Sequence, residues 1–388
     1  MKRNGAGDRR RLARRRFLAT AGAAATLGLA GCTSLPGFGG DDQANSVTPA
    51  DFQGSGPLVA GRPAPGGTSM DEMPDLSGEL TVYLGGGEGG RYLDLLRLIQ
   101  QKYDGFTFRL KQDSSSSLAN TIVEETGGGT SPADVFISID AGSVGAVTAA
   151  GATTSLPANV LDPVRDAFQD SNGRWVGLEG RARTIPYNSA QLSASDVPAS
   201  IDAVPSTQAL ADAVGWAPTY GAFQSFVTAM RLLEGEQATR EWLQTMVDLG
   251  VTEYRDEFLT TNAVADGEVL AGFANHYYAL RVQARRPDAP VEIAFTKGDA
   301  GALVNVSAGA VIQDTESPDL AANFIRHLLS AEAQEFFATV TYGYPMIPDV
   351  QPVGGLPTID DLNPPDLDLT ELSDIQPTLD LMREVGVL

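Results

Sequence analysis

The sequence predicts an α/β fold of two lobes, in which mainly parallel sheets are flanked by helices. The chain has 388 residues, which exceeds one ordinary core and favours two lobes of about 100–150 residues each. From residue 79 onward, short runs of β-branched and aromatic residues alternate with stretches of helical spacing. Strands that alternate with helices are typical of a sheet wrapped by helices.

The first part of this folded body contains three strand–helix cycles. Each strand-like run is followed by apolar residues at helical spacing. The predicted strands are 79–84, 106–112 and 134–139, and the predicted helices are 91–103, 118–126 and 141–151.

A glycine-rich stretch, 85-GGGEGG-90, separates the first strand from its helix. Open α/β sheets bind ligands at the carboxyl ends of strands, and the N-terminus of a following helix attracts anions. The stretch does not spell the glycine pattern of a dinucleotide-binding turn, and no Walker-type lysine is present. We therefore predict no nucleotide site here.

The second part of the folded body returns to the same alternation. Two strong helices each end at a glycine, as helices commonly do. An acidic, proline-rich tail at 353–374 precedes a closing helix. The predicted helices are 221–235, 236–250, 318–330, 331–340 and 375–386, and the predicted strands are 291–295 and 302–312.

The N-terminus has the three parts of an export signal. Arg14 and Arg15 precede an uncharged run, and 29-LAGC-32 follows it. The run is too short to span a bilayer comfortably and has the length of a signal-peptide apolar region. Because the paired arginines resemble a twin-arginine signal and LAGC resembles a lipoprotein box, residues 1–32 are predicted to be a twin-arginine lipoprotein signal peptide. Lipidation at Cys32 would hold the protein at the extracellular face of the cytoplasmic membrane.

The single cysteine excludes one bond and leaves one alternative to lipidation. Cys32 is the only cysteine, so no intrachain disulfide can form; the alternative to lipidation is a buried thiol after a short membrane anchor. Residues 33–78 are rich in Gly, Pro, Ser and Asp without apolar periodicity, and are predicted to be a flexible tether. One acyl chain binds a membrane only marginally, so firm attachment needs an ether lipid or several chains.

The charge of the chain indicates the salt concentration in which it works and argues against nucleic acid as a partner. The formal net charge is −22, with only four lysines. An acid-rich, lysine-poor surface is expected of a protein that works in concentrated salt, where carboxylates hold water and ions. A polyanionic nucleic acid is not expected to bind it.

Seven segments of the folded body stand in an order that is informative as a set. They are 80-LTVYLGG-86, 131-SPADVFISIDAGSVGAV-147, 173-GRWVGLEGRARTIPYN-188, 215-GWAPTYGAFQSFVTAM-230, 275-NHYYAL-280, 299-DAGALVNVSAGAV-311 and 343-GYPMIP-348. Together they resemble the ferric-iron-binding proteins that serve ABC importers, within the periplasmic-binding-protein fold. The resemblance covers residues 79–388 and implies two lobes joined by a hinge: lobe 1 from 79–184 plus about 299–350, and lobe 2 from about 185–298 plus 351–388. It also implies capture of Fe(III), delivery to an ABC permease and its ATPase, and a monomer.

The resemblance assigns an adjacent tyrosine pair, Tyr277 and Tyr278, to Fe(III) through two phenolates. Ionising a phenol of pKa near 10 at pH 7 costs about 4 kcal/mol. A trivalent ion about 2 Å away offsets that cost even at an effective dielectric constant of about 20, and hard cations prefer oxygen donors. The alternative is that both rings pack between the lobes with their hydroxyls hydrogen-bonded.

Further metal ligands are implied less directly. Tyr220 lies where some family members supply a third tyrosine. Alternatively, the N-terminus of its helix, at Gly221, holds a synergistic anion such as carbonate or phosphate. Some members use a carboxylate at the end of the third strand, where this chain has Ile139 followed by Asp140, which makes Asp140 a candidate ligand.

Other polar residues of the same segments have expected supporting roles. Asn275 is expected to position an anion, and His276 to be structural. Glu88 stands in the turn where some relatives carry His or Arg, and either binds there or caps the helix. Arg181 and Arg183 are expected to tie the lobes by ion pairs.

Two rival functions remain at this point. The same fold could carry thiamine, a phosphonate, a polyamine or another anion, which the altered glycine turn and Ile139 favour. An enzyme is not expected, because the chain has no GxSxG, no HExxH, no nucleophilic cysteine and just two distant histidines.

Overall fold

The computed structural model describes residues 47–86 and 89–388, which belong to one compact unit, Asn45–Leu388. The predicted signal peptide, Cys32 and Glu88 lie outside the described residues. Within the described ranges, no helix combines the length and apolarity needed to cross a membrane.

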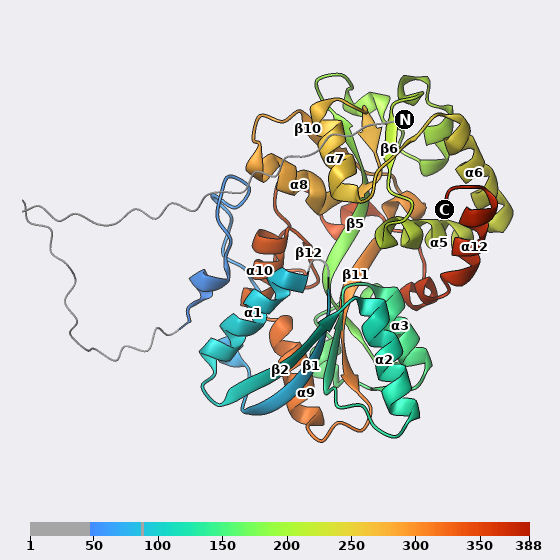
Figure 1. Cartoon of the computed structure of the whole chain (residues 1–388). Helices are drawn as coiled ribbons and strands as arrows, with labels where there is room; N and C mark the ends of the chain where they lie inside the picture. Colours follow the sequence, from blue (N-terminus) through green and yellow to red (C-terminus); the bar gives the residue numbers. More distant parts are fainter. Residues whose placement is uncertain (1–46, 87–88) are drawn as a thin grey trace, which may run out of the picture. The chain divides into compact units, whose positions relative to one another are not determined.

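Lobe 1 is built on a mixed sheet with helices on its faces (Figure 1). The first three strands of the chain run parallel, with β1 in the middle, and β11 and β5 then join antiparallel beyond β3. The strands are β1 (Gly78–Gly85), β2 (Phe106–Asp113), β3 (Val135–Ser138), β4 (Thr153–Thr154), β11 (Val304–Ile312), β12 (Tyr344–Pro345) and the first half of β5 (Val176–Asn188). The helices are α1 (Gly89–Lys102), α2 (Ser115–Gly127), α3 (Ala141–Ala149), α4 (Ala158–Leu161), α9 (Pro318–Leu328) and α10 (Ala331–Phe336).

Lobe 2 shares strand β5 with lobe 1. The second half of β5 pairs antiparallel with three short strands, and one of these, β8, continues parallel into β6 and β7. The strands are β6 (Val214–Trp216), β7 (Thr252–Glu253), β8 (Ala271–Gly272), β9 (Ala274–Asn275) and β10 (Val291–Ala294). The helices are α5 (Gly221–Glu234), α6 (Glu236–Asp248), α7 (Glu257–Asp266), α8 (His276–Arg285) and α12 (Gln376–Glu384).

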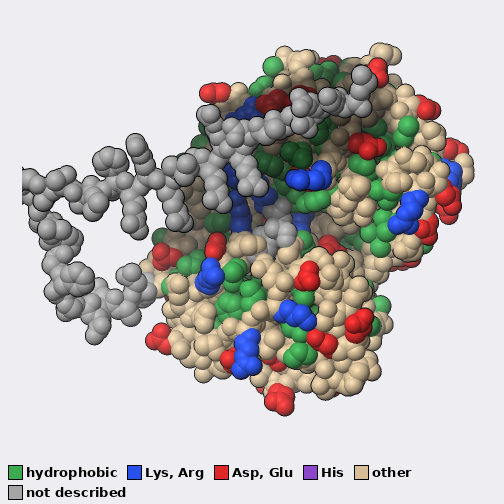
Figure 2. Space-filling view, viewed as in Figure 1, with side chains coloured by type: hydrophobic (Ala, Val, Ile, Leu, Met, Phe, Trp, Pro, Cys, Tyr) green, Lys and Arg blue, Asp and Glu red, His purple; other side chains and the backbone are tan. Residues whose placement is uncertain are grey.

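The α/β fold class is confirmed, and the strand directions refine it. Each lobe contains a parallel set, but β5 and β11 run antiparallel to their neighbours, so the sheets are mixed rather than mainly parallel. The predicted helix 331–340 is α10 followed by a π turn, Phe337–Thr341. Acidic side chains are spread over the face in Figure 2, which is hollowed between the two lobes.

Residues 47–78, which we name the strap, differ from the predicted tether. The strap contains two 3-10 turns, Pro49–Phe52 and Met70–Glu72, and buries the side chains of Phe52 and Met70 completely. Arg62 of the strap forms an ion pair of 2.9 Å with Glu335 of α10. The strap is therefore fastened to lobe 1, because isolated apolar anchors and one arginine hold it without any periodic pattern.

The C-terminal tail contacts both lobes instead of belonging to lobe 2 alone as predicted. A 3-10 turn at Leu369–Ser373 packs on α3, so closely that a Cβ on Gly142 would lie 2.9 Å from the carbonyl oxygen of Leu372. The following helix α12 packs on α5 and α6 of lobe 2. A short α11 (Ile359–Leu362) precedes this turn.

An acidic cluster in lobe 2 predicts a pH-dependent stability. Burial raises the pKa of Glu234 to about 7, and the carboxylates of Asp202 and Asp299 add to the rise. Between pH 4.5 and about 7 the folded state holds more protons than the unfolded state, so stability falls as the pH rises through this window.

Glu234→Gln removes this effect. Because the side chain is only half-buried, we expect a gain in unfolding free energy of about 1 kcal/mol at pH 8 and no gain at pH 4, measured by thermal unfolding at both values. An equal gain at the two pH values would contradict the interpretation.

Candidate functional site

The predicted tyrosine pair lies in the first turn of α8. Tyr277 and Tyr278 follow the N-cap Asn275, which ends strand β9. Both rings are buried, at 3% and 4% exposure, and their centres are 4.4 Å apart. The pair thus sits where a short strand turns into a helix.

A third phenol meets the pair from a second helix. The hydroxyl of Tyr220, the N-cap of α5, is 2.5 Å from the hydroxyl of Tyr278. Phe258 of α7 and Tyr342, from the segment between α10 and β12, pack against the rings. We name Tyr220, Tyr277 and Tyr278 the phenol cluster; its three residues lie at the positive ends of two helix dipoles, which favour negative charge on oxygen.

An arginine lies over the pair. The guanidinium carbon of Arg281 is 4.7 Å from the ring centre of Tyr277 and 5.5 Å from that of Tyr278. This cation–π contact fixes the rings and places positive charge beside the phenols. No role was expected for Arg281, although its spacing of three and four residues from the pair puts it on the same face of the helix.

A buried polar network supports Asn275. Arg183 of β5 forms an ion pair with Glu257, the first residue of α7, and also donates to the side-chain oxygen of Asn275 at 3.3 Å. Glu257 accepts the backbone N–H of Asn275 at 2.9 Å. The side-chain nitrogen of Asn275 donates to the hydroxyl oxygen of Tyr277 at 3.2 Å. No pattern in the sequence pointed to Glu257.

Among the described residues, the ion pairs of the two β5 arginines each join residues of one lobe, whereas a link between the lobes was expected. Arg183 and Glu257 both belong to lobe 2. Arg181 pairs with Glu179 of the same strand at 3.6 Å and donates to the hydroxyl of Ser307 at 2.7 Å, both in lobe 1.

His276 is structural, as predicted. Its Nδ1 accepts the backbone N–H of Ala182 at 3.2 Å, so its Nε2 carries the proton and donates to the carbonyl oxygen of Tyr342 at 2.7 Å. Burial lowers the pKa of His276 to about 4, which keeps the ring neutral at pH 7. The residue joins α8 to β5 and to the segment before β12.

Asp140 stands apart from the phenol cluster. It is the N-cap of α3, where its carboxylate accepts the backbone N–H of Ser143 at 2.7 Å and the Ser143 hydroxyl at 3.0 Å. Burial raises the pKa of Asp140. Within the described residues, these contacts explain Asp140 as a helix cap and do not bring it to the phenols, whereas Gly221 directly follows Tyr220 at the start of α5.

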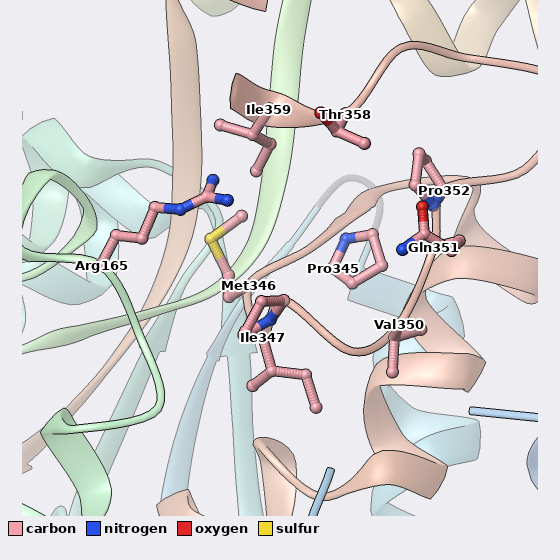
Figure 3. A pocket seen from close by; sticks show the side chains of 10 residues that line it. Arg165, Pro345, Met346, Ile347, Val350, Gln351, Pro352, Thr358 and Ile359 are labelled. Atoms are coloured by element: carbon pink, nitrogen blue, oxygen red, sulfur yellow. The ribbon is translucent and has the colours of Figure 1, made fainter. Parts of the chain in front are cut away.

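Two cavities lie elsewhere and are lined by no tyrosine. The first, of about 30 Å³, is shown in Figure 3, where Arg165 and Ile359 extend toward Met346. It has room for one or two waters. The second is an open groove of about 510 Å³ on lobe 1, between the strap and α9. The phenol cluster is the candidate site because its three hydroxyls are hard oxygen donors brought together from two helices.

Comparisons with known proteins agree with this fold and give the family. The family model described as "Bacterial extracellular solute-binding protein" matches residues 96–361, and the chain belongs to that family. Within it, the chain is 31% identical to the "Major ferric iron-binding protein" of Neisseria meningitidis serogroup B, over 80% of this chain and 93% of the relative.

Two further comparisons point the same way. The chain is 30% identical to the "Fe(3+)-binding periplasmic protein" of Serratia marcescens, over 75% of this chain and 88% of the relative. The crystal structure of iron-bound HitA from Pseudomonas aeruginosa superposes with a TM-score of 0.71 at 28% identity, over 79% of this chain and 99% of that chain. The resemblance drawn from the sequence is thereby confirmed.

Proposed function

We propose that this protein captures Fe(III) at the phenol cluster and delivers it to an ABC importer. The observation that carries the proposal is the 2.5 Å approach of the Tyr220 and Tyr278 hydroxyls beside the buried Tyr277. Three phenol oxygens at two helix N-termini suit a small, highly charged cation, because such an ion repays the cost of deprotonating them. The names of the relatives from Neisseria and Serratia support the same cargo.

A synergistic anion completes this proposal. The N-terminus of α5 begins at Gly221, and its backbone N–H groups suit carbonate or phosphate. The amide nitrogen of Asn275 has two hydrogens, of which one is directed to Tyr277 and the second suits the anion. Asp140 is kept as a candidate ligand, since its two cap hydrogen bonds leave acceptor sites on the carboxylate, and Glu88 is kept as a candidate in the glycine turn.

The cellular setting is proposed with the cargo. Export through the twin-arginine pathway and lipidation at Cys32 would place the protein at the extracellular face of the membrane, as a monomer beside a permease and its ATPase. The acidic composition, with a net charge of −22, suits work in concentrated salt. Mass spectrometry of the N-terminal peptide tests the lipid at Cys32 directly, and an unmodified thiol contradicts it.

The cargo is tested on protein purified from its native compartment. We expect stoichiometric iron by metal analysis and a phenolate–Fe(III) absorption band in the visible range. A thermal-shift panel of Fe(III), thiamine, a phosphonate and a polyamine distinguishes the alternative cargo, because a ligand that binds the folded state raises its melting temperature. A shift with an organic solute and none with Fe(III) would overturn the proposal.

Tyr220→Phe tests the third phenol alone. The substitution keeps the ring and removes the hydroxyl that meets Tyr278, so we expect Fe(III) affinity to fall by about 10–100-fold, the range seen when one supporting partner of a metal site is lost. Competition with citrate measures the affinity. Tyr254→Phe, a lobe 2 phenol outside the cluster, is the control, and an equal effect of both variants would remove Tyr220 from the site.

A further inference from the structure

The orientation of the Asn275 side chain is fixed by the chemistry of its neighbour. Arginine has five N–H donors and no acceptor, so the group of Asn275 that faces Arg183 must be its carbonyl oxygen. The amide nitrogen is then forced toward the hydroxyl oxygen of Tyr277. The orientation of the Asn275 side-chain amide is thus set by the donor-only chemistry of Arg183.

The network around Asn275 holds that orientation from two sides. Glu257 binds both the guanidinium of Arg183 and the backbone N–H of Asn275, which closes a ring of three residues. The Arg183 guanidinium carbon also lies 5.5 Å from the ring centre of Phe226. The side chains of Arg183 and Glu257 are 4% and 0% exposed, so water does not compete for these contacts.

A contribution to stability does not by itself explain the ion pair between Arg183 and Glu257. A buried ion pair is often no more stabilising than apolar residues of the same volume. The Nη2 atom of Arg183 is moreover buried and finds no hydrogen-bond partner among the residues that the structure describes, which costs stability. A role in positioning explains why a charged, donor-only side chain lies here.

We propose that Arg183 and Glu257 are positioning residues that hold the Asn275 amide with its donor toward Tyr277. The inference rests on the proposed function, in which the Tyr277 oxygen is a metal ligand. A donated hydrogen bond stabilises the negative charge of a metal-bound phenolate. The reversed amide would turn its carbonyl oxygen toward that charge.

The test compares two neutralised ion pairs. The double variant Arg183→Gln/Glu257→Gln removes the donor-only side chain, and since it removes both charges it leaves none buried alone. The double variant Arg62→Gln/Glu335→Gln, which we name the strap variant, removes a similarly buried pair between the strap and α10. Arg183→Lys is the conservative variant, because lysine is also donor-only.

The readouts are the position of the visible band of the Fe(III)-loaded protein and the rate of iron release to excess citrate. We expect Arg183→Gln/Glu257→Gln to shift the band and to release iron about tenfold faster. Arg183→Lys and the strap variant should keep the wild-type band and rate, although the strap variant melts at a lower temperature.

Failure of the proposed function and failure of the positioning role give different results. A wild-type protein without a band overturns the proposed function itself. A wild-type band that Arg183→Gln/Glu257→Gln leaves unchanged, or that Arg183→Lys disturbs equally, overturns the positioning role alone.

Discussion

The double variant Tyr277→Phe/Tyr278→Phe is expected to lose Fe(III) binding and the visible absorption band. Two phenol oxygens disappear while both rings remain, so the packing around the 4.4 Å ring pair is kept. Loss of one outer partner of a metal site already weakens affinity 10–100-fold. We therefore expect the loss of two direct ligands to exceed about 10⁴-fold, measured by citrate competition and by titration of the band.

The matched control replaces two phenols of the same lobe outside the cluster. Tyr187→Phe/Tyr254→Phe should retain the band and the affinity. Melting temperatures of the apo proteins check that each variant is folded. Undiminished iron binding by Tyr277→Phe/Tyr278→Phe would exclude the phenol cluster as the metal site.

Glu335→Ala is expected to give the largest loss of stability. The side chain of Glu335 is 2% exposed, and both of its carboxylate oxygens accept hydrogen bonds from the Arg62 guanidinium. It also accepts a hydrogen bond of 3.0 Å from the side-chain amide of Gln53. Removing one partner of a buried pair costs about 3–5 kcal/mol. Arg62 keeps its hydrogen bonds to the backbone carbonyl oxygens of Gln351 and Pro352. We therefore expect a loss of unfolding free energy of about 3 kcal/mol, at the lower end of that range.

Denaturant unfolding measures this loss, and limited proteolysis locates it. Cleavage should appear within the strap before it appears in α10 or the sheets. Glu316→Ala, at an exposed position, is the control and should change the unfolding free energy by less than about 0.5 kcal/mol. A strap that stays resistant in Glu335→Ala would mean that its apolar anchors suffice.

Local patterns in the sequence predicted most helices and strands. They did not predict which strands, far apart in the chain, pair with one another. The run 79–84 became β1, Gly78–Gly85, because alternation of apolar residues is a local signal. The run 302–312 was predicted to be a strand and is β11, Val304–Ile312. Its antiparallel place between β3 and β5 depends on residues far away in the chain, which no local pattern encodes.

The candidate site likewise has a part that local sequence predicts and a part that depends on tertiary packing. Tyr277 and Tyr278 are neighbours in sequence, so the pair could be recognised from NHYYAL. The meeting of Tyr220 with Tyr278 depends on how α5 and α8 come together across 58 positions. Asp140 is the N-cap of α3, an arrangement that the sequence offers locally because Ser143 follows three residues later, and its role as a ligand stays a prediction.

The strap was missed for a further physical reason. A segment without periodicity can still be ordered if a few of its side chains fit cavities on a preformed surface. Phe52, Val59, Met70, Met73 and Leu76 do this without any helical or strand spacing. Composition rules average over such positions and therefore describe the segment as a tether.

The fastening of the strap also determines where a force on the N-terminal side of the molecule is felt. A pull from upstream of residue 47 acts on lobe 1, since the strap is joined there through Arg62 and its buried anchors. Such a pull would load the Arg62–Glu335 contact before any strand of the sheets.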